Sequence, residues 1–456
     1  MTIWTPTLPK DGRPRYIAIA DAIGADITAG KLSVGDRLPP QRTLAGTLGI
    51  DFTTVTRAYA EAQTRGLVRS HVGRGTFVAT GARTSDLRDP VRSVAEDLSM
   101  NRPPEPTDPA LLDAMRGGLD YVGANLVSLL RYQSATGGER DRAAASTWLS
   151  LRGMVPNLDR IAVAPGAHPA MTAILSIHCR PGDVVLCERI TYPGIRNIAA
   201  LLGLRLVGVD MDRDGILPDA LGAAITAHGP KMLYLNPTLQ NPTTITVPAR
   251  RRLEIAKVLN HHGLPLIEDD AYGFIPTKAP PPMALHAPEL TWHVGGLAKC
   301  IGAGLRLAYT VAPSARDGFQ LEQALRAHSV MPSPLTMALT TRWIEDGTAD
   351  RIRRFVRGET VARQAIAAEH LSGYNYDANE FAFNLWLRLP KGSGRADIVS
   401  GMAGRRVGIM PSDTFTVSGI PDEHVRVCLG GAITREDLAA GLFHLSQTLA
   451  AAGFRG

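Results

Sequence analysis

The chain has 456 residues, of which 45% are hydrophobic and 20% charged, and a formal net charge of +6. This length exceeds that of one ordinary domain, and the composition excludes a wholly disordered chain. The sequence has no apolar run of the roughly 18–20 residues that a membrane span needs, no signal region, and four widely spaced cysteines. We therefore expect a cytoplasmic protein without a membrane segment, a disulfide framework or a bound metal.

The first 80 residues are the basic part of the chain. They hold ten Lys and Arg against six Asp and Glu, and so carry four of the six excess positive charges. A compact basic segment on a near-neutral body indicates a polyanion partner, although a solvated basic face has the same composition.

Spacing of apolar residues predicts three short helices and a hairpin within residues 13–79. Ile17, Ala20, Ile23 and Ile27 recur at helical steps, and a second helix follows Pro39-Pro40. Asp51 is placed to cap a third helix, and two strands near residues 67–69 and 76–78 flank a glycine turn. A helix, a turn and a second helix can place one helix in the major groove of DNA, with the hairpin as a wing.

The residues that we expect to contact DNA lie at the start of the second helix, in the third helix and in the glycine turn. They are Arg42, Thr53, Thr54, Thr56, Arg57, Gly73 and Arg74. A purely structural helical module fits the same pattern. The segments G-D-R-L-P-x-x-R, L-G-I-x-x-x-T-V-x-R-A-Y, G-L-V and G-x-G-T-F-V, within residues 30–80, closely resemble the winged helix-turn-helix of the GntR family of bacterial transcription regulators. The resemblance implies a DNA-binding domain over residues 1–80.

Residues 81–108 are rich in charge and proline without a sustained period, and we predict a linker there. From 109 to 456 short apolar runs alternate with alanine-rich helical stretches, as parallel strands with crossover helices do. The runs lie at 161–163, 184–186, 206–209, 232–235 and 264–267. The expected fold is an α/β body with a large part over about 150–320 and a smaller α+β lobe over about 321–456.

Several motifs in this body suit a pyridoxal phosphate site. Lys299 lies in a Gly-rich apolar stretch, which lowers the pKa of an amine and favours attack on an aldehyde. Arg306 suits a phosphate, and Asp269 suits a protonated ring nitrogen. Tyr272 and Asn241 suit the ring hydroxyl, Tyr192 suits stacking, and Gly166-Ala167 open a helix as an anion site does. Taken singly, these motifs also fit surface charges, strand-end acids and turns.

In this order the segments resemble the fold-type I aminotransferases, of the aspartate aminotransferase class, over roughly residues 98–452. The resemblance implies pyridoxal 5'-phosphate bound to Lys299 as an imine, with the other motif residues in the roles just given. It also implies that Arg426 binds an α-carboxylate. Tyr132 matches a tyrosine that reaches the phosphate of the partner subunit, which requires a homodimer. The hydroxyl residues usual near the lysine are replaced by Gly296 and Ala298, so one or two phosphate hydrogen bonds are missing.

A GntR-type domain, a linker and an aminotransferase-like body resemble the MocR subfamily of bacterial regulators. The resemblance implies a pyridoxal phosphate-dependent transcription factor, a head-to-tail homodimer on double-stranded operator DNA. Its effector is the cofactor itself, or an amine or amino acid that exchanges at Lys299. Two alternatives stay open: a working aminotransferase with an accessory DNA-binding domain, and a pure cofactor sensor that controls vitamin B6 supply.

Overall fold

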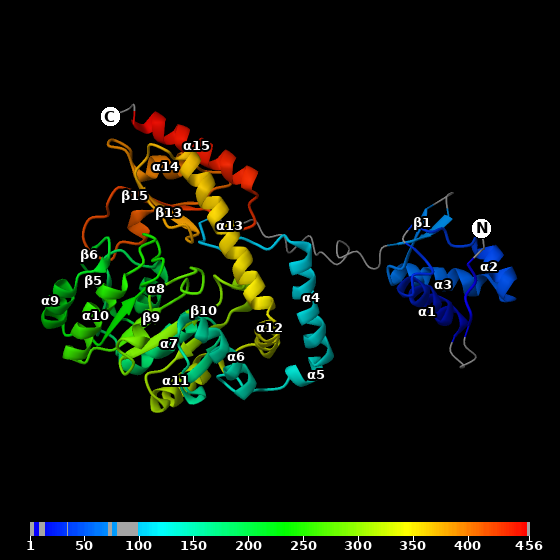
Figure 1. Ribbon diagram of the computed structural model, residues 1–456, viewed down its shortest axis with the longest axis horizontal. Coiled ribbons are helices and arrows are strands. Elements are labelled where there is room, and N and C mark those ends of the chain that lie inside the picture. The colour runs from blue at the N-terminus through cyan, green and yellow to red at the C-terminus, as the bar shows by residue number, and fades with distance from the viewer. Residues whose placement is uncertain (1–3, 9–13, 34, 72–74, 80–98, 454–456) are drawn as a thin grey trace. The chain divides into compact units, whose positions relative to one another are not determined.

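The computed structural model describes residues 4–8, 14–33, 35–71, 75–79 and 99–453 (Figure 1). The chain divides into two compact units, Met1–Glu96 and Asp97–Gly456. Among the described residues, no helix is both long and apolar enough to cross a membrane.

The first unit contains the three predicted helices and the predicted hairpin: α1 (Arg15–Thr28), α2 (Gln41–Leu48), α3 (Phe52–Thr64), β1 (Val68–His71) and β2 (Gly75–Val78). Asp51 caps α3 as expected, because its carboxylate accepts a hydrogen bond from the Thr53 backbone N–H at 2.7 Å. Val55, Ala58 and Tyr59 of α3 are buried against α1 and α2, so the opposite face of α3 is left to solvent.

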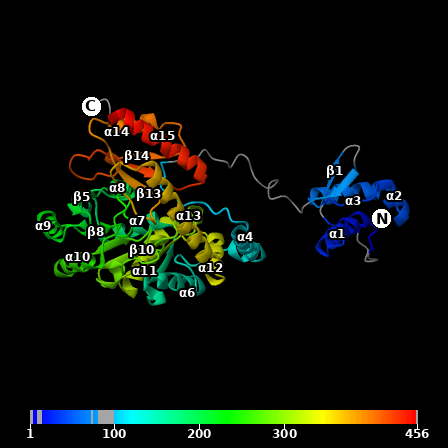
Figure 2. The same ribbon diagram turned by 45° about the horizontal axis from the view of Figure 1, so that its top comes forward.

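A seven-stranded sheet forms the centre of the second unit, in the order β3-β11-β10-β9-β8-β4-β5. Its strands are β3 (Ile161–Ala164), β4 (Val184–Glu188), β5 (Arg205–Val209), β8 (Met232–Leu235), β9 (Leu266–Asp269), β10 (Thr291–Gly296) and β11 (Ala308–Val311). Each of the five predicted runs overlaps a strand of this sheet, and the helices cover both of its faces (Figures 1 and 2).

Alternation along the strands explains the two helical layers. In β4, Val185 and Cys187 join one apolar cluster, whereas Val184 and Leu186 join another. The first cluster includes residues of α7 (Ala167–His178), α8 (Pro193–Leu201) and α11 (Ala315–Ser329). The second includes residues of α9 (Pro218–His228) and α10 (Ala249–His262). Both faces of the strand are therefore buried, which is why its sequence is continuously apolar.

The five predicted strands run in the same direction, but the sheet is mixed because of β11, which was not predicted. β11 runs antiparallel to both of its neighbours, β10 and β3. Only residues 297–307 join β10 to β11, a connection shorter than the dozen or more residues that a parallel crossover needs. Because β11 reverses direction, β3 runs the same way as β10, and their carboxyl ends lie at the same edge of the sheet.

The smaller lobe is built on a four-stranded antiparallel sheet in the order β12-β13-β15-β14. Its strands are β12 (Tyr376–Asp377), β13 (Asn384–Arg388), β14 (Ile409–Pro411) and β15 (His424–Cys428). Its helices include α14 (Arg395–Gly401) and α15 (Arg435–Gly453), and α13 (Thr348–His370) runs along α15 from the larger part (Figure 1).

The remaining elements complete the second unit. They are α4 (Pro109–Ala124), α5 (Leu126–Leu129), α6 (Glu139–Leu149), α12 (Pro334–Glu345), the pair β6 (Met211–Asp212) and β7 (Gly215–Ile216), and the short 3-10 turns η2 (Ser150–Arg152), η3 (Leu158–Arg160), η4 (Met283–Leu285), η5 (Ala303–Leu305) and η6 (Ser412–Thr414). Residues 99–108, which the sequence assigns to the linker, are packed into this unit, where Pro104 pairs with Gly431.

Candidate cofactor site and nucleic-acid interface

The predicted cofactor residues come together at the carboxyl edge of the seven-stranded sheet. Asp269 is the last residue of β9, and Lys299 follows three residues after β10. Gly166 follows β3, and Arg306 precedes β11. Ligands of open α/β sheets bind at this edge, because loops from neighbouring strands meet there.

Lys299 has an amine that is easily deprotonated. Burial, together with the positive charge of Arg426, lowers the pKa of its side chain to about 8. The amine lies 5.9 Å from the centre of the Tyr272 ring and donates a hydrogen bond to the backbone oxygen of Asn101. A neutral amine is the form that attacks an aldehyde.

Asp269 offers one buried oxygen to a cationic partner. Its Oδ2 atom accepts a hydrogen bond from the Tyr234 hydroxyl at 2.8 Å, whereas its Oδ1 atom is buried without a partner among the described residues. Burial raises the pKa of this carboxyl to about 6, although the Tyr234 hydrogen bond opposes the rise. A protonated pyridine nitrogen at Oδ1 would satisfy the oxygen and favour the charged carboxylate, so the site fits pyridoxal phosphate.

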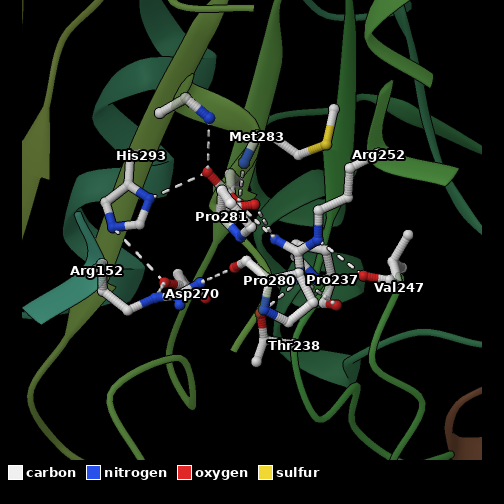
Figure 3. Close-up of polar contacts among 12 residues, drawn as sticks. Arg152, Pro237, Thr238, Val247, Arg252, Asp270, Pro280, Pro281, Met283 and His293 are labelled. Atoms are coloured by element: carbon white, nitrogen blue, oxygen red, sulfur yellow. Dashed lines mark hydrogen bonds and ion pairs between the residues drawn. The ribbon is translucent and has the colours of Figure 1, made fainter. Parts of the chain in front are cut away.

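The two acids beside Asp269 belong to a separate buried charge cluster (Figure 3). Arg152 Nε donates to Asp270 Oδ2 at 2.7 Å, and Arg252 Nη1 lies 3.5 Å from Glu268 Oε1. His293 contacts both acids, with a ring nitrogen 3.1 Å from Glu268 Oε2. Burial alone would raise the pKa of Asp270, but Arg152 lowers it to about 2. These acids are thus neutralised by arginines, and Asp269 alone of the three faces the site.

Groups that suit a phosphate lie where α7 begins. Gly166 has a φ of +115°, which favours glycine, and a Cβ there would lie 3.1 Å from Arg306 Nη2. The Arg306 guanidinium therefore lies against the first turn of α7, where Ala167 contributes a free backbone N–H at the positive end of the helix dipole. Burial, together with the positive charges of Arg306 and Lys299, lowers the pKa of His168. The His168 ring accepts or donates a 2.8 Å hydrogen bond with the Tyr192 hydroxyl.

The opposite end of the site contains Arg426, on β15. Its Nη1 atom donates to Asn241 Oδ1 at 2.9 Å, so the side-chain oxygen of Asn241 faces the arginine. The Tyr272 hydroxyl accepts a 3.0 Å hydrogen bond from the Asn101 side-chain amide, and burial raises the pKa of Tyr272. Tyr132 is 87% exposed, and the structure does not bring it to the site of its own chain.

Three site residues were not predicted from the sequence: Asn101, Tyr234 and Asn384. Tyr234 had a usable signal, because a tyrosine within the apolar run Met232–Leu235 needs a hydrogen-bond partner when it is buried. Asn101 and Asn384, whose side chains are 3.0 Å apart, had none, since they are joined only by the tertiary fold.

The predicted DNA-binding residues lie on the exposed side of α3 and at the start of α2. Thr53, Thr56 and Arg57 are exposed, as is Arg42, and Thr54 is half-buried. The Arg57 guanidinium lies 4.2 Å from the centre of the Tyr16 ring. Gly73 and Arg74, predicted for the wing, lie outside the described residues.

Comparison with known proteins assigns each unit to a family. Residues 15–78 match the gntR family of bacterial regulatory proteins, and residues 97–445 match aminotransferase class I and II. The chain is 29% identical to the HTH-type transcriptional regulator YdeF of Bacillus subtilis, over 98% of this chain and 96% of that protein. It is 26% identical to the probable rhizopine catabolism regulatory protein MocR of Rhizobium meliloti, over 83% and 82%.

The second unit also has the fold of solved aminotransferases. The α-aminoadipate aminotransferase LysN of Thermus thermophilus, complexed with N-(5'-phosphopyridoxyl)-L-leucine, superimposes with a TM-score of 0.70 at 22% identity, covering 79% of this chain and 93% of that one. Pyridoxal phosphate is the cofactor that this family implies. The chain belongs to aminotransferase class I and II through residues 97–445, and the gntR-family domain ahead of them is consistent with the MocR subfamily of regulators.

Proposed function

We propose that this chain is a pyridoxal phosphate-dependent transcription regulator. Its first unit binds double-stranded operator DNA, and its second unit senses the cofactor or an amine or amino acid that exchanges with it at Lys299. The observation that carries the proposal is the buried Oδ1 atom of Asp269, which has no partner in the part of the chain that the structure describes and lies in the same site as an amine with a pKa of about 8. The same chain presents an exposed helix face with threonines and an arginine.

Each predicted residue has one role in this proposal. Lys299 holds the cofactor covalently and Asp269 keeps its ring nitrogen protonated. The remaining contacts are made by Tyr272 and Asn241 at the ring oxygen, by Gly166, Ala167 and Arg306 at the phosphate, by Tyr192 on the ring, and by Arg426 at the effector carboxylate. The cofactor, when bound, supplies an electrophilic carbon and an electron sink.

The assembly that we propose is a head-to-tail homodimer. Leu126, Val127 and Leu130, in and just after α5, are exposed apolar side chains close in sequence to Tyr132. Exposed apolar side chains gathered in one segment favour a protein interface. A partner subunit docked there would receive the Tyr132 hydroxyl at its phosphate.

Borohydride trapping tests the cofactor site. We expect the purified protein, loaded with pyridoxal phosphate and reduced, to yield a pyridoxyl adduct on the peptide that contains Lys299. Lys299→Ala should lose both the adduct and the visible absorbance band. An adduct confined to other lysines would refute the proposed site.

A working aminotransferase is the second candidate, because Lys299, Asp269, Tyr272 and Arg426 are all in one site. Turnover with a panel of amino acids and a keto-acid acceptor separates the two functions. A regulator changes its absorbance with amines but releases little product, whereas an enzyme releases product through many cycles. An absorbance that responds to no amine favours a pure cofactor sensor.

The DNA-binding role is tested by Arg57→Ala, against Lys31→Ala as the control. Lys31 carries the same charge in the same unit but lies in the loop after α1 and pairs with Asp26 at 3.0 Å. Loss of an arginine–phosphate contact should weaken binding and reduce the slope of log affinity against log salt by about 1. Equal slopes for the two variants, measured by fluorescence anisotropy on a duplex selected from a random pool, would contradict a contact by Arg57.

A further inference from the structure

Residues 99–104 lie across the candidate cofactor site. Arg426 donates a hydrogen bond to the backbone oxygen of Ser99, and Lys299 donates one to the backbone oxygen of Asn101. Backbone oxygens of the chain itself therefore contact the two groups that the proposed function assigns to ligands: Arg426, which binds the effector carboxylate, and Lys299, which binds the cofactor.

This segment is fastened to both parts of the second unit. The Asn101 side chain is 4% exposed, and its Nδ2 atom lies 3.0 Å from both the Tyr272 hydroxyl and Asn384 Oδ1. Farther along, the Gly431 N–H donates to the Pro103 oxygen at 3.2 Å. Tyr272 belongs to the larger part, and Asn384 and Gly431 belong to the smaller lobe, so the segment bridges the two.

The guanidinium of Arg426 is incompletely satisfied by this arrangement. Its Nη1 atom is bonded to Asn241 and its Nη2 atom to Ser99, whereas its Nε atom is buried without a partner among the described residues. A carboxylate bonds the Nε–Nη2 edge of an arginine with two parallel hydrogen bonds. A carboxylate would therefore satisfy both atoms, but only after the Ser99 oxygen has left Nη2.

We propose that Ser99–Asn101 is a built-in occupant of the effector site, and that an effector carboxylate displaces it from Arg426. This inference rests on the proposed function. It adds that the effector carboxylate starts the change that reaches the DNA-binding unit. Ser99 follows directly on residues 80–98, which join the two units in sequence. Release at Ser99 is thus the event by which a ligand in the second unit alters DNA binding by the first.

One glycine allows the segment to be expelled without changing a site residue. A Cβ added at Gly430 would lie 1.6 Å from the backbone oxygen of Arg102, so Gly430→Ala forces the turn at Gly430 and residues 99–104 apart. The matched control is Gly358→Ala in α13, where a new Cβ meets no atom within 4 Å.

The test uses the full chain loaded with pyridoxal phosphate and two probes. Maleate offers carboxylates without an amine, and ethylamine offers an amine without a carboxylate. In the wild type, maleate should raise deuterium exchange across residues 99–104, whereas ethylamine should change the absorbance band without raising that exchange. Gly430→Ala should show raised exchange without any ligand and bind maleate about tenfold more tightly, because the competitor has been removed.

DNA binding gives the second readout. Without ligand, Gly430→Ala should bind the selected duplex with the affinity that the wild type shows with saturating maleate, and Gly358→Ala should match the unliganded wild type. Raised deuterium exchange across residues 99–104 with an unchanged DNA affinity would overturn the role of this segment in signalling. If Gly430→Ala does not fold, Asn101→Ala removes the two side-chain anchors and is held to the same expectations.

The inference and the proposed function fail in different ways. If maleate leaves the exchange of residues 99–104 unchanged in the wild type and neither variant raises it, the segment is not a displaceable occupant, whatever the DNA results. If instead the wild type selects no duplex or carries no adduct on Lys299, the proposed function fails, and the inference that rests on it falls as well.

Discussion

The amine of Lys299 sets the pH range in which the protein can take up its cofactor. An amine of pKa about 8 is roughly 10% neutral at pH 7, about 300-fold more than an ordinary lysine. The rate of cofactor attachment to the cofactor-free protein should therefore rise about tenfold per pH unit below pH 8 and level off above it. Stopped-flow absorbance from pH 6.5 to 10 measures this rate, and a rise that continues past pH 9.5 would contradict the lowered pKa.

Gly296 marks a place where cofactor affinity can be increased. A Cβ at this position would lie 3.6 Å from the Ala167 side chain and 3.9 Å from Ala271, which is ordinary contact. Gly296→Ser restores the hydroxyl that is usual there, and a hydrogen bond to a charged phosphate should lower the dissociation constant of the cofactor about tenfold. Gly296→Ala is the control for the added carbon. Equal affinities of the two variants in equilibrium dialysis would show that the hydroxyl does not reach the phosphate.

Among the site residues, those that lie in a recognisable sequence motif could be predicted from the sequence. Gly166 and Asp269 could be named because each lies at the end of a predicted apolar strand, which places it at the sheet edge. Lys299 and Arg306 could be named because they share one Gly-rich apolar stretch. Asn101 could not, because it lies in a proline-rich stretch without a period, 198 residues from the lysine that it contacts.

Packing of α4 against α12 supplies a test at the scale of elements. A Cβ at Gly118 would lie 2.3 Å from Trp343 Nε1, whereas a Cβ at the neighbouring Gly117 meets no atom within 4 Å. Gly118→Ala should lower the stability of the second unit by about 1–3 kcal/mol through overpacking, and Gly117→Ala should raise it by about 0.5–1 kcal/mol. Calorimetric unfolding of the full chain measures both, and an increase in stability for both variants would show that α4 and α12 can separate at no cost.

The central strands were predictable because they are buried on both faces, but two strands of the same sheet were missed. β10 reads Thr-Trp-His-Val-Gly-Gly and β11 reads Ala-Tyr-Thr-Val, so neither contains the run of aliphatic residues that marks the predicted strands. Their antiparallel pairing depends on a short connection between them, which apolar patterning does not report.

Subunit exchange tests the molecule as a whole. If Tyr132 serves the partner subunit, a dimer of one Tyr132→Ala chain and one Lys299→Ala chain has one complete site, built from the lysine of the first and the tyrosine of the second. Mixing the two variants should therefore create a fraction of tightly held cofactor that neither homodimer has. The measurement is the cofactor absorbance retained after dialysis, and no gain on mixing would argue that Tyr132 acts within its own chain or not at all.

The buried ion pairs of Glu268 and Asp270 have a consequence for reading related sequences. Removing one member of a buried pair leaves an uncompensated charge and destabilises a protein by about 3–5 kcal/mol. A related protein that no longer binds the cofactor would thus still be under selection to retain Glu268 and Asp270, together with Arg152 and Arg252. Only the middle position, Asp269, would be free to drift. In a distant relative, that single residue distinguishes a cofactor-binding chain from one that keeps only the architecture.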